Sequence, residues 1–188
     1  AINNSGLGHH AQYMHFTEFM KNDENTQKIC MDSDIIIVER NIFQDVITLF
    51  SYYKVRGKTI MITLDDGYHI MHKKNPTYDF WTNGKMRFKD QNGVDQEGVM
   101  FPHPLTQLRW GLEMSVGLQT VSPALCDYWR TATDTYLIHN HIYVKDYENV
   151  EPLYKHPNNI FIGWTGSLSH IDSFESSLLA AIMIVSLS

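Results

Sequence analysis

The feature that most constrains the fold of this chain is a strand–helix–strand pattern in its first third. DIIIVER, residues 34–40, holds four consecutive apolar residues, three of them isoleucine, which is typical of a buried strand. A helical period follows, with Asn41 at its start, Gln44 in capping-box spacing and Gly57 at its end. TIMITL, residues 59–64, is a second buried strand. The pattern predicts two parallel strands joined by a right-handed crossover.

The same alternation of strands and helices continues toward the C-terminus. The spacing predicts a helix over 105–117, a strand over 118–121 and a further strand over 135–140. The segment PALCDYWRTAT, residues 123–133, begins with proline at a position suited to the first turn of a helix. We therefore expect an α/β fold with a Rossmann-like parallel sheet and flanking helices.

Three other segments have weaker patterns. HAQYMHFTEFMK, residues 10–21, has apolar residues at helical spacing, whereas KNDENTQK, residues 21–28, looks like a polar connection. Residues 73–104 are polar and rich in glycine and proline without a helical period. They predict a long loop, with a hairpin about Asn83-Gly84.

The end of the sequence restarts the α/β pattern. NIFIGWTGSLSH, residues 159–170, reads as a strand, a glycine turn and the head of a helix. The chain begins without a methionine or a signal peptide, and it ends inside an amphipathic run. We expect a fragment of a longer protein, with one Rossmann-like domain over residues 1–157 and the truncated start of a second domain over residues 158–188.

Composition excludes several classes of protein. The chain is 43% hydrophobic with a net charge of −6, which suits a packed core and disfavours a basic surface for nucleic acid. No apolar run reaches the roughly 18 residues of a transmembrane helix, although peripheral contact with a membrane stays open. Two cysteines make no disulfide framework, so we expect free thiols and a cytoplasmic location.

Polar residues follow the predicted strands. The stretch ITLDDGYHI places Asp65 and Asp66 directly after one strand, while Ser122 and Asn140 follow two others. In parallel α/β sheets, ligands bind where loops leave the carboxyl ends of the strands. These residues are therefore expected to lie at a binding edge.

One interpretation of this stretch is a metal site. ITLDDGY resembles the TFDDG motif of polysaccharide deacetylases, in which the first aspartate is a catalytic base and the second binds a divalent metal. Such a site also needs two histidines one helical turn apart. Here His69 and His72 are separated by two residues, and His139 and His141 by one, so no pair has that spacing.

The order of several segments resembles a second family, the group 1 glycosyltransferases of the GT-B fold, whose two Rossmann-like domains enclose a cleft. The segments are DSDIIIVERN, GKTIMITLDDGYHIM, LQTVSPALCDYW, TYLIHNHI and NNIFIGWTGSLSHIDSF. His139 stands where that family usually has proline.

The resemblance implies transfer of a sugar from a nucleotide-diphosphate sugar, the co-substrate, to a glycan, lipid or other acceptor, without a metal or other cofactor. It implies catalytic roles for Asp65, Asp66 and His69. The residues expected to bind substrate, through glycine turns and strand ends, are Gly6, Gly8, Asn140, Gly166, Ser167 and His170. It also implies that the 188-residue chain is inactive without the rest of a C-terminal domain, whereas the completed protein transfers sugar.

Two structural alternatives stay open. Asp65 and Asp66 could cap the loop after the strand, with Gly67 at positive φ. The chain could also be a Rossmann-like module that binds a ligand and catalyses nothing, because the architecture alone does not specify a function.

Overall fold

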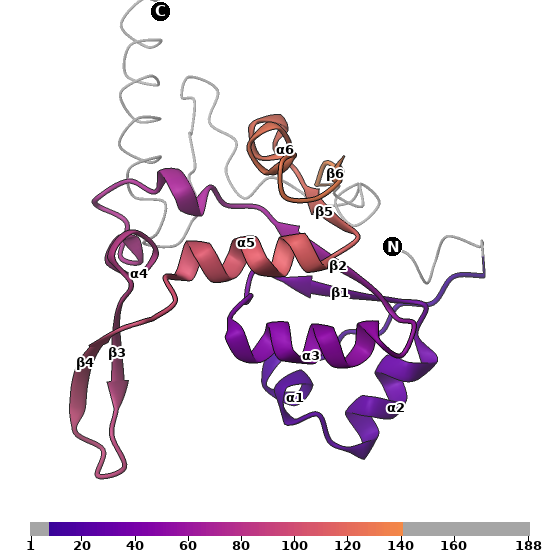
Figure 1. Cartoon of the computed structure of the whole chain (residues 1–188), viewed down its shortest axis with the longest axis horizontal. Helices are drawn as coiled ribbons and strands as arrows, with labels where there is room; N and C mark the ends of the chain where they lie inside the picture. The colour runs from indigo at the N-terminus through magenta and orange to yellow at the C-terminus, as the bar shows by residue number, and fades with distance from the viewer. Residues whose placement is uncertain (1–7, 141–188) are drawn as a thin grey trace, which may run out of the picture. The chain divides into compact units, whose positions relative to one another are not determined.

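The structure is a computed structural model that describes residues 8–140 of the chain (Figure 1). The predicted start of a second domain at residues 158–188 lies outside these residues. The described chain divides into two compact units, which are presented separately. The first contains residues 8–66 and 107–140, and the second contains residues 67–106.

Four parallel strands form the sheet of the first unit, in the order β1-β2-β5-β6. They are β1 (Ile35–Glu39), β2 (Thr59–Leu64), β5 (Gly117–Thr120) and β6 (Thr135–Leu137). The predicted parallel α/β sheet of Rossmann-like type is thus confirmed.

Two helices run side by side along this sheet. They are α3 (Gln44–Lys54) and α5 (Pro104–Met114). The Gln107 side chain accepts a hydrogen bond from the Gln44 N–H at 2.6 Å, and Lys54 Nζ donates to the Met114 carbonyl at 2.7 Å. Since their starts and their ends are joined, the two helices are parallel. No helix within residues 8–140 is both long and apolar enough to cross a membrane.

The helices cover one face of the sheet more fully than the other. A Cβ on Gly111 of α5 would lie 2.1 Å from Ile42 and 3.7 Å from Ile62, so glycine allows α5 to approach the face that carries Ile62. Ile62 is fully buried on that face. On the opposite face of β1, Ile35 and Ile37 are 49% and 52% exposed. Parallel sheets in globular proteins usually have both faces covered.

The predicted role of Asn41 as the N-cap of α3 is wrong. The helix begins at Gln44 rather than near Asn41, and its N-cap residue Phe43 makes no side-chain capping bond. The Asn41 N–H donates to the Glu39 carbonyl at 2.5 Å, in a turn where Arg40 has a φ of +44°. The missing cap is supplied by Gln107, 63 residues away in the sequence.

Two short helices precede β1, and their boundaries differ from the sequence prediction. Helix α1 (Phe16–Lys21) is half as long as the helix expected over 10–21. Helix α2 (Glu24–Asp32) occupies the expected polar connection. Asp23 caps α2 by accepting from the Thr26 N–H at 2.9 Å, which compensates for a sequence with few apolar residues.

These helices are tied to α3 by aromatic and polar contacts. The rings of Phe19 and Tyr53 stack with centroids 6.1 Å apart. The buried Tyr53 hydroxyl donates to Asn22 Oδ1 at 2.7 Å, and Asn22 ends α1 in the left-handed region at φ +48°. The Tyr52 hydroxyl bonds Gln27 of α2 at 3.0 Å.

The second unit contains a short 3-10 helix η2 (Tyr68–Ile70), α4 (Tyr78–Asn83) and a hairpin of β3 (Lys85–Lys89) and β4 (Asp95–Val99). The expected hairpin exists, but its turn was placed wrongly. Gly84 is the left-handed C-cap of α4, and the turn lies at residues 90–94. An Asn-Gly pair suits both a tight hairpin turn and a helix C-cap, so the local sequence could not decide.

Candidate functional site

The first unit brings the carboxyl ends of its four strands to one edge of the sheet. Arg40 follows β1, the pair Asp65 and Asp66 follows β2, Ser122 lies beyond β5 and Asn140 lies beyond β6. All four strands are parallel, so these residues leave the sheet on the same side. We call this set of residues the carboxyl edge.

The exit from β2 carries the two aspartates. Leu64 is buried as the last residue of the strand, Asp65 is exposed and Asp66 is partly buried. Gly67 has a φ of −87°, so the expected left-handed turn is absent at this residue. A Cβ at Gly67 would instead lie 2.9 Å from the Ile70 side chain, which explains why glycine fits there.

His69, the third predicted catalytic residue, belongs to the second unit. It lies in η2 and is partly buried, and burial lowers the pKa of its imidazole. Desolvation disfavours the charged form, so the neutral ring is favoured near neutral pH. A neutral imidazole can accept a proton or a hydrogen bond, which is the chemistry required of a general base.

The exit from β1 carries an ion pair. The Arg40 guanidinium donates to Glu39 Oε1 from Nη2 at 2.6 Å and from Nε at 3.1 Å. Both side chains are about half exposed, and a pair of this kind contributes little net stability. An anionic ligand could therefore replace the Glu39 carboxylate at modest cost. The left-handed backbone of Arg40 is uncommon for a residue with a side chain.

The exit from β5 leads into α6 (Pro123–Trp129), which starts at the predicted proline. Ser122 occupies the N-cap position, but its side chain makes no capping hydrogen bond. Its N–H donates to Thr120 Oγ1 at 3.4 Å. The partly buried hydroxyl of Ser122 is thus placed at the carboxyl edge with the capacity to donate to or accept from a ligand.

The exit from β6 ends the described chain. The Ile138 N–H donates to the Thr120 carbonyl at 2.9 Å, which extends the pairing of β5 and β6 by one residue. Asn140 follows two residues later and is exposed. Its amide has both donor and acceptor groups.

Five residues besides Asn140 were predicted to bind substrate. Gly6, Gly166, Ser167 and His170 lie outside the described residues. Gly8 is exposed at φ +75° and α1 starts only at Phe16, so Gly8 does not lie at the start of a helix, where a glycine turn would present N–H groups to an anion. Residues 10–15, which were expected to be helical, lie outside any helix.

Among residues 8–140, no three histidine, cysteine, aspartate or glutamate side chains come together in a way that could hold a metal ion. The carboxyl edge instead combines a cation, two carboxylates, a hydroxyl and an amide. Such a set can form hydrogen bonds with a ligand that is rich in hydroxyl groups and can bind an anionic group.

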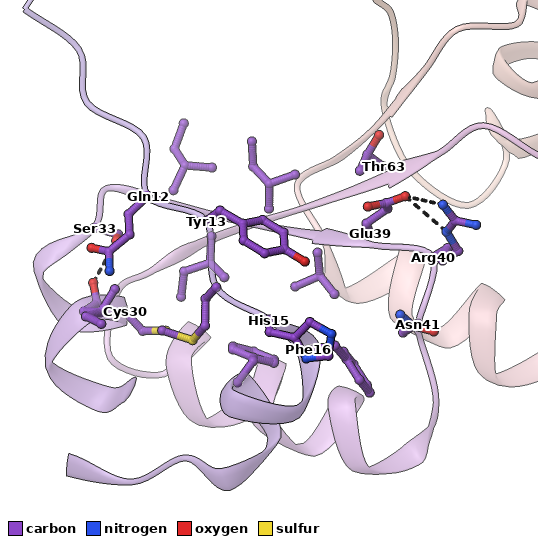
Figure 2. Close-up of a pocket in the computed structure, with 17 residues that line it drawn as sticks. Gln12, Tyr13, His15, Phe16, Cys30, Ser33, Glu39, Arg40, Asn41 and Thr63 are labelled. Carbon is purple, nitrogen blue, oxygen red and sulfur yellow. Dashed lines mark hydrogen bonds and ion pairs between the residues drawn. The ribbon is translucent and has the colours of Figure 1, made fainter. Parts of the chain in front are cut away.

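A cavity that sequence reasoning did not predict lies beside β1. It has a volume of about 650 Å³ and reaches from Cys30 and Ser33 to Glu39 and Arg40. Figure 2 shows the Glu39–Arg40 pair at one end and Tyr13 over the middle of the cavity. The only sequence signal of this cavity was the apolar run in DIIIVER, because a strand of this kind is usually covered by apolar side chains.

Comparison of the chain with protein-family models, with curated proteins and with solved structures found no match in any of the three. Evidence for a function therefore comes from the geometry of the carboxyl edge.

Proposed function

We propose that the carboxyl edge binds the sugar substrates of a glycosyltransferase. The observation that carries this proposal is the common exit side of the four parallel strands, which gathers Arg40, Asp65, Asp66, Ser122 and Asn140. Ligands of parallel α/β sheets bind outside the carboxyl ends of the strands. The resemblance of several segments to group 1 glycosyltransferases supports the choice of reaction.

The residue types at this edge suit the reaction. In sugar transfer, an acceptor hydroxyl attacks the anomeric carbon, and the bond from that carbon to the diphosphate oxygen breaks. The nucleoside diphosphate leaves with the electron pair, and the hydroxyl proton must move to a base. In this proposal Asp65 and Asp66 accept hydrogen bonds from acceptor hydroxyls, and one of them takes the proton. Arg40 stabilises the negative charge on the departing phosphates.

The test is a transfer assay on protein expressed from the complete reading frame that contains this sequence. Uridine-, guanosine- and adenosine-diphosphate sugars are offered with a mixture of glycan and lipid acceptors, and release of the nucleoside diphosphate and formation of a glycoside are both measured. We expect turnover that Asp66→Asn reduces on the order of a hundredfold, the size expected for loss of a general base.

Asp32→Asn is the matched control, because Asp32 is exposed at the end of α2 and precedes β1, at the opposite end of the strands. It should transfer at the rate of the unchanged protein. No turnover of any donor, or equal rates for Asp66→Asn and Asp32→Asn, would contradict the proposal.

Two simple measurements distinguish the proposed glycosyltransferase from two other functions. Binding of a nucleotide sugar without turnover by the complete protein would favour a non-catalytic binding module. Stoichiometric binding of zinc, manganese or cobalt that Asp66→Ala abolishes would favour a metal-dependent deacetylase.

A further inference from the structure

Two Asn-Gly pairs occur in the sequence, and both lie in the second unit. Asn83-Gly84 ends α4, whereas Asn92-Gly93 lies in the turn between β3 and β4. Asparagine is one of the thermolabile residues. The nitrogen of the following residue can attack its side-chain carbonyl carbon, and glycine hinders this attack least because it has no Cβ. The surroundings of each pair therefore decide which asparagine reacts.

Asn83-Gly84 is held on both sides of the reacting atoms. The Asn83 side-chain amide donates to Asp79 Oδ1 at 2.7 Å, and the Gly84 N–H donates to the Phe80 carbonyl at 2.9 Å. Gly84 is buried, and a Cβ there would lie 3.2 Å from the Met100 carbonyl oxygen. The Gly84 nitrogen is thus free to attack only when the end of the helix opens.

Asn92-Gly93 is open to solvent. Both residues are exposed, and a Cβ at Gly93 would meet no atom within 4 Å. The Gly93 N–H donates to the Asp90 carbonyl at 2.9 Å. Asp90 Oδ1 accepts from the N–H groups of Asn92 and Val94, both at 2.9 Å. These bonds lie at the tip of a two-stranded hairpin, so few other contacts must break when they open.

We propose that Asn92 is a site of spontaneous deamidation. The Gly93 nitrogen loses its proton to water or hydroxide and forms a bond to Asn92 Cγ. The amide nitrogen leaves with the electron pair of the broken bond, takes up a proton and departs as ammonia, which leaves a cyclic succinimide. Water then adds to either carbonyl of the ring. Cleavage of the bond from nitrogen to Cγ gives aspartate, and cleavage at the main-chain carbonyl gives isoaspartate, in which the chain runs through Cγ.

The reaction changes the hairpin turn. Either product places a new carboxylate close to Asp90, in a chain whose net charge is already −6. Isoaspartate also adds a carbon atom to the main chain between two strands in regular register. We therefore expect faster amide hydrogen exchange at Phe88 and Gln96, which are partners across the hairpin, after the reaction.

The test follows the 188-residue chain over several weeks in mildly alkaline buffer. Trypsin cleaves after lysine and arginine, so the two asparagines fall in separate peptides, 75–85 and 90–109. Mass spectrometry then measures the loss of each amide. In the folded protein Asn92 should react on the order of tenfold faster than Asn83, because opening of the packed helix end costs more free energy than opening of the exposed turn. In concentrated urea the two rates should converge.

Two variants of the hairpin test the role of the turn. Asp90→Ala removes the carboxylate that holds the N–H groups of Asn92 and Val94, so it should raise the rate at Asn92 several-fold and leave the rate at Asn83 unchanged. Asp95→Ala is the matched control, because it also removes one carboxylate from the hairpin. Asp95 forms an exposed ion pair with Lys89 at 3.7 Å, which contributes little stability, so the rate at Asn92 should not change.

Equal rates at Asn83 and Asn92 in the folded protein, or no reaction at Asn92, would overturn the proposal. A tenfold difference that persists in urea would also overturn it, because the flanking sequence rather than the folded turn would then be the cause. An unchanged rate in Asp90→Ala would overturn the role given to opening of the turn.

Discussion

The side chain of Gln107 accepts a hydrogen bond from the N–H of Gln44 at 2.6 Å, so the start of α3 is capped by a residue of α5. Gln107 is only 2% exposed. The first N–H groups of a helix have no partner within the helix, and an acceptor from outside the helix stabilises its start. This contact therefore couples two helices that lie beside each other on the sheet.

Replacing Gln107 with methionine should destabilise the first unit. The substitution keeps the approximate volume but removes the acceptor that caps the Gln44 N–H, and loss of a helix N-cap costs about 0.5–2 kcal/mol. The free energy of unfolding in urea, followed by circular dichroism, measures the effect. Gln91→Met in the exposed hairpin turn is the control and should change this free energy by less than about 0.5 kcal/mol. Equal values for the two variants would show that the cap contributes nothing.

Because the Tyr53 phenol is buried, we expect the protein to lose stability at alkaline pH. Burial raises the pKa of its phenol above the ordinary value of 10. Because the folded pKa is raised, the stability is fully present below about pH 10 and is lost as pH rises through the folded pKa, since the unfolded state releases the proton first. Burial raises the pKa of the Cys30 thiol as well, so Cys30 adds a slope of the same sign.

Tyr53→Phe should therefore flatten, but not abolish, the fall in unfolding free energy above pH 10. It should also cost about 1 kcal/mol at pH 7 through loss of the hydrogen bond to Asn22. Urea titrations at several pH values measure both effects. Tyr13→Phe is the control, because Tyr13 is 84% exposed. An unchanged alkaline slope in Tyr53→Phe would refute this explanation.

Because the His69 imidazole is partly buried, we expect the protein to lose stability at acidic pH. Burial lowers the pKa of His69 in the folded state below its ordinary value of about 6.5. At a pH between the folded and the unfolded pKa, the unfolded state therefore binds a proton that the folded state does not. Stability is thus present above pH 6.5 and falls as pH drops through this window. Urea unfolding of His69→Gln should show a flatter slope there, and the same substitution at exposed His72 is the control. A His69 ring that titrates above 6.5 by nuclear magnetic resonance would contradict the prediction.

The parallel sheet could be predicted because its signals are local. The apolar runs before Arg40 and Asp65 are short, rich in branched residues and separated by a helical period. Once the strands are parallel, their carboxyl ends share a side, and this places Asp65, Ser122 and Asn140 together without further information.

The missed features depend on contacts between distant segments or on ambiguous local patterns. The start of α3 needed Gln107, and α2 was missed because its helical sequence is mostly polar and depends on the Asp23 cap. The Asn83-Gly84 pair fits two structures equally well. The cavity beside β1 is lined by residues 12–15, which the sequence predicted to be helical but which lie outside any helix.

The most direct test of the carboxyl edge is a map of ligand contacts by nuclear magnetic resonance. Uridine-, guanosine- and adenosine-diphosphate sugars are added to the 15N-labelled 188-residue chain, and amide shifts are followed at both ends of the strands. We expect at least one donor to shift the amides of Arg40, Asp66 and Ser122 and to leave those of Thr59 and Gly117, at the opposite ends of the strands, unchanged. Shifts confined to Thr59 and Gly117, or no shift with any donor, would contradict binding at the carboxyl edge.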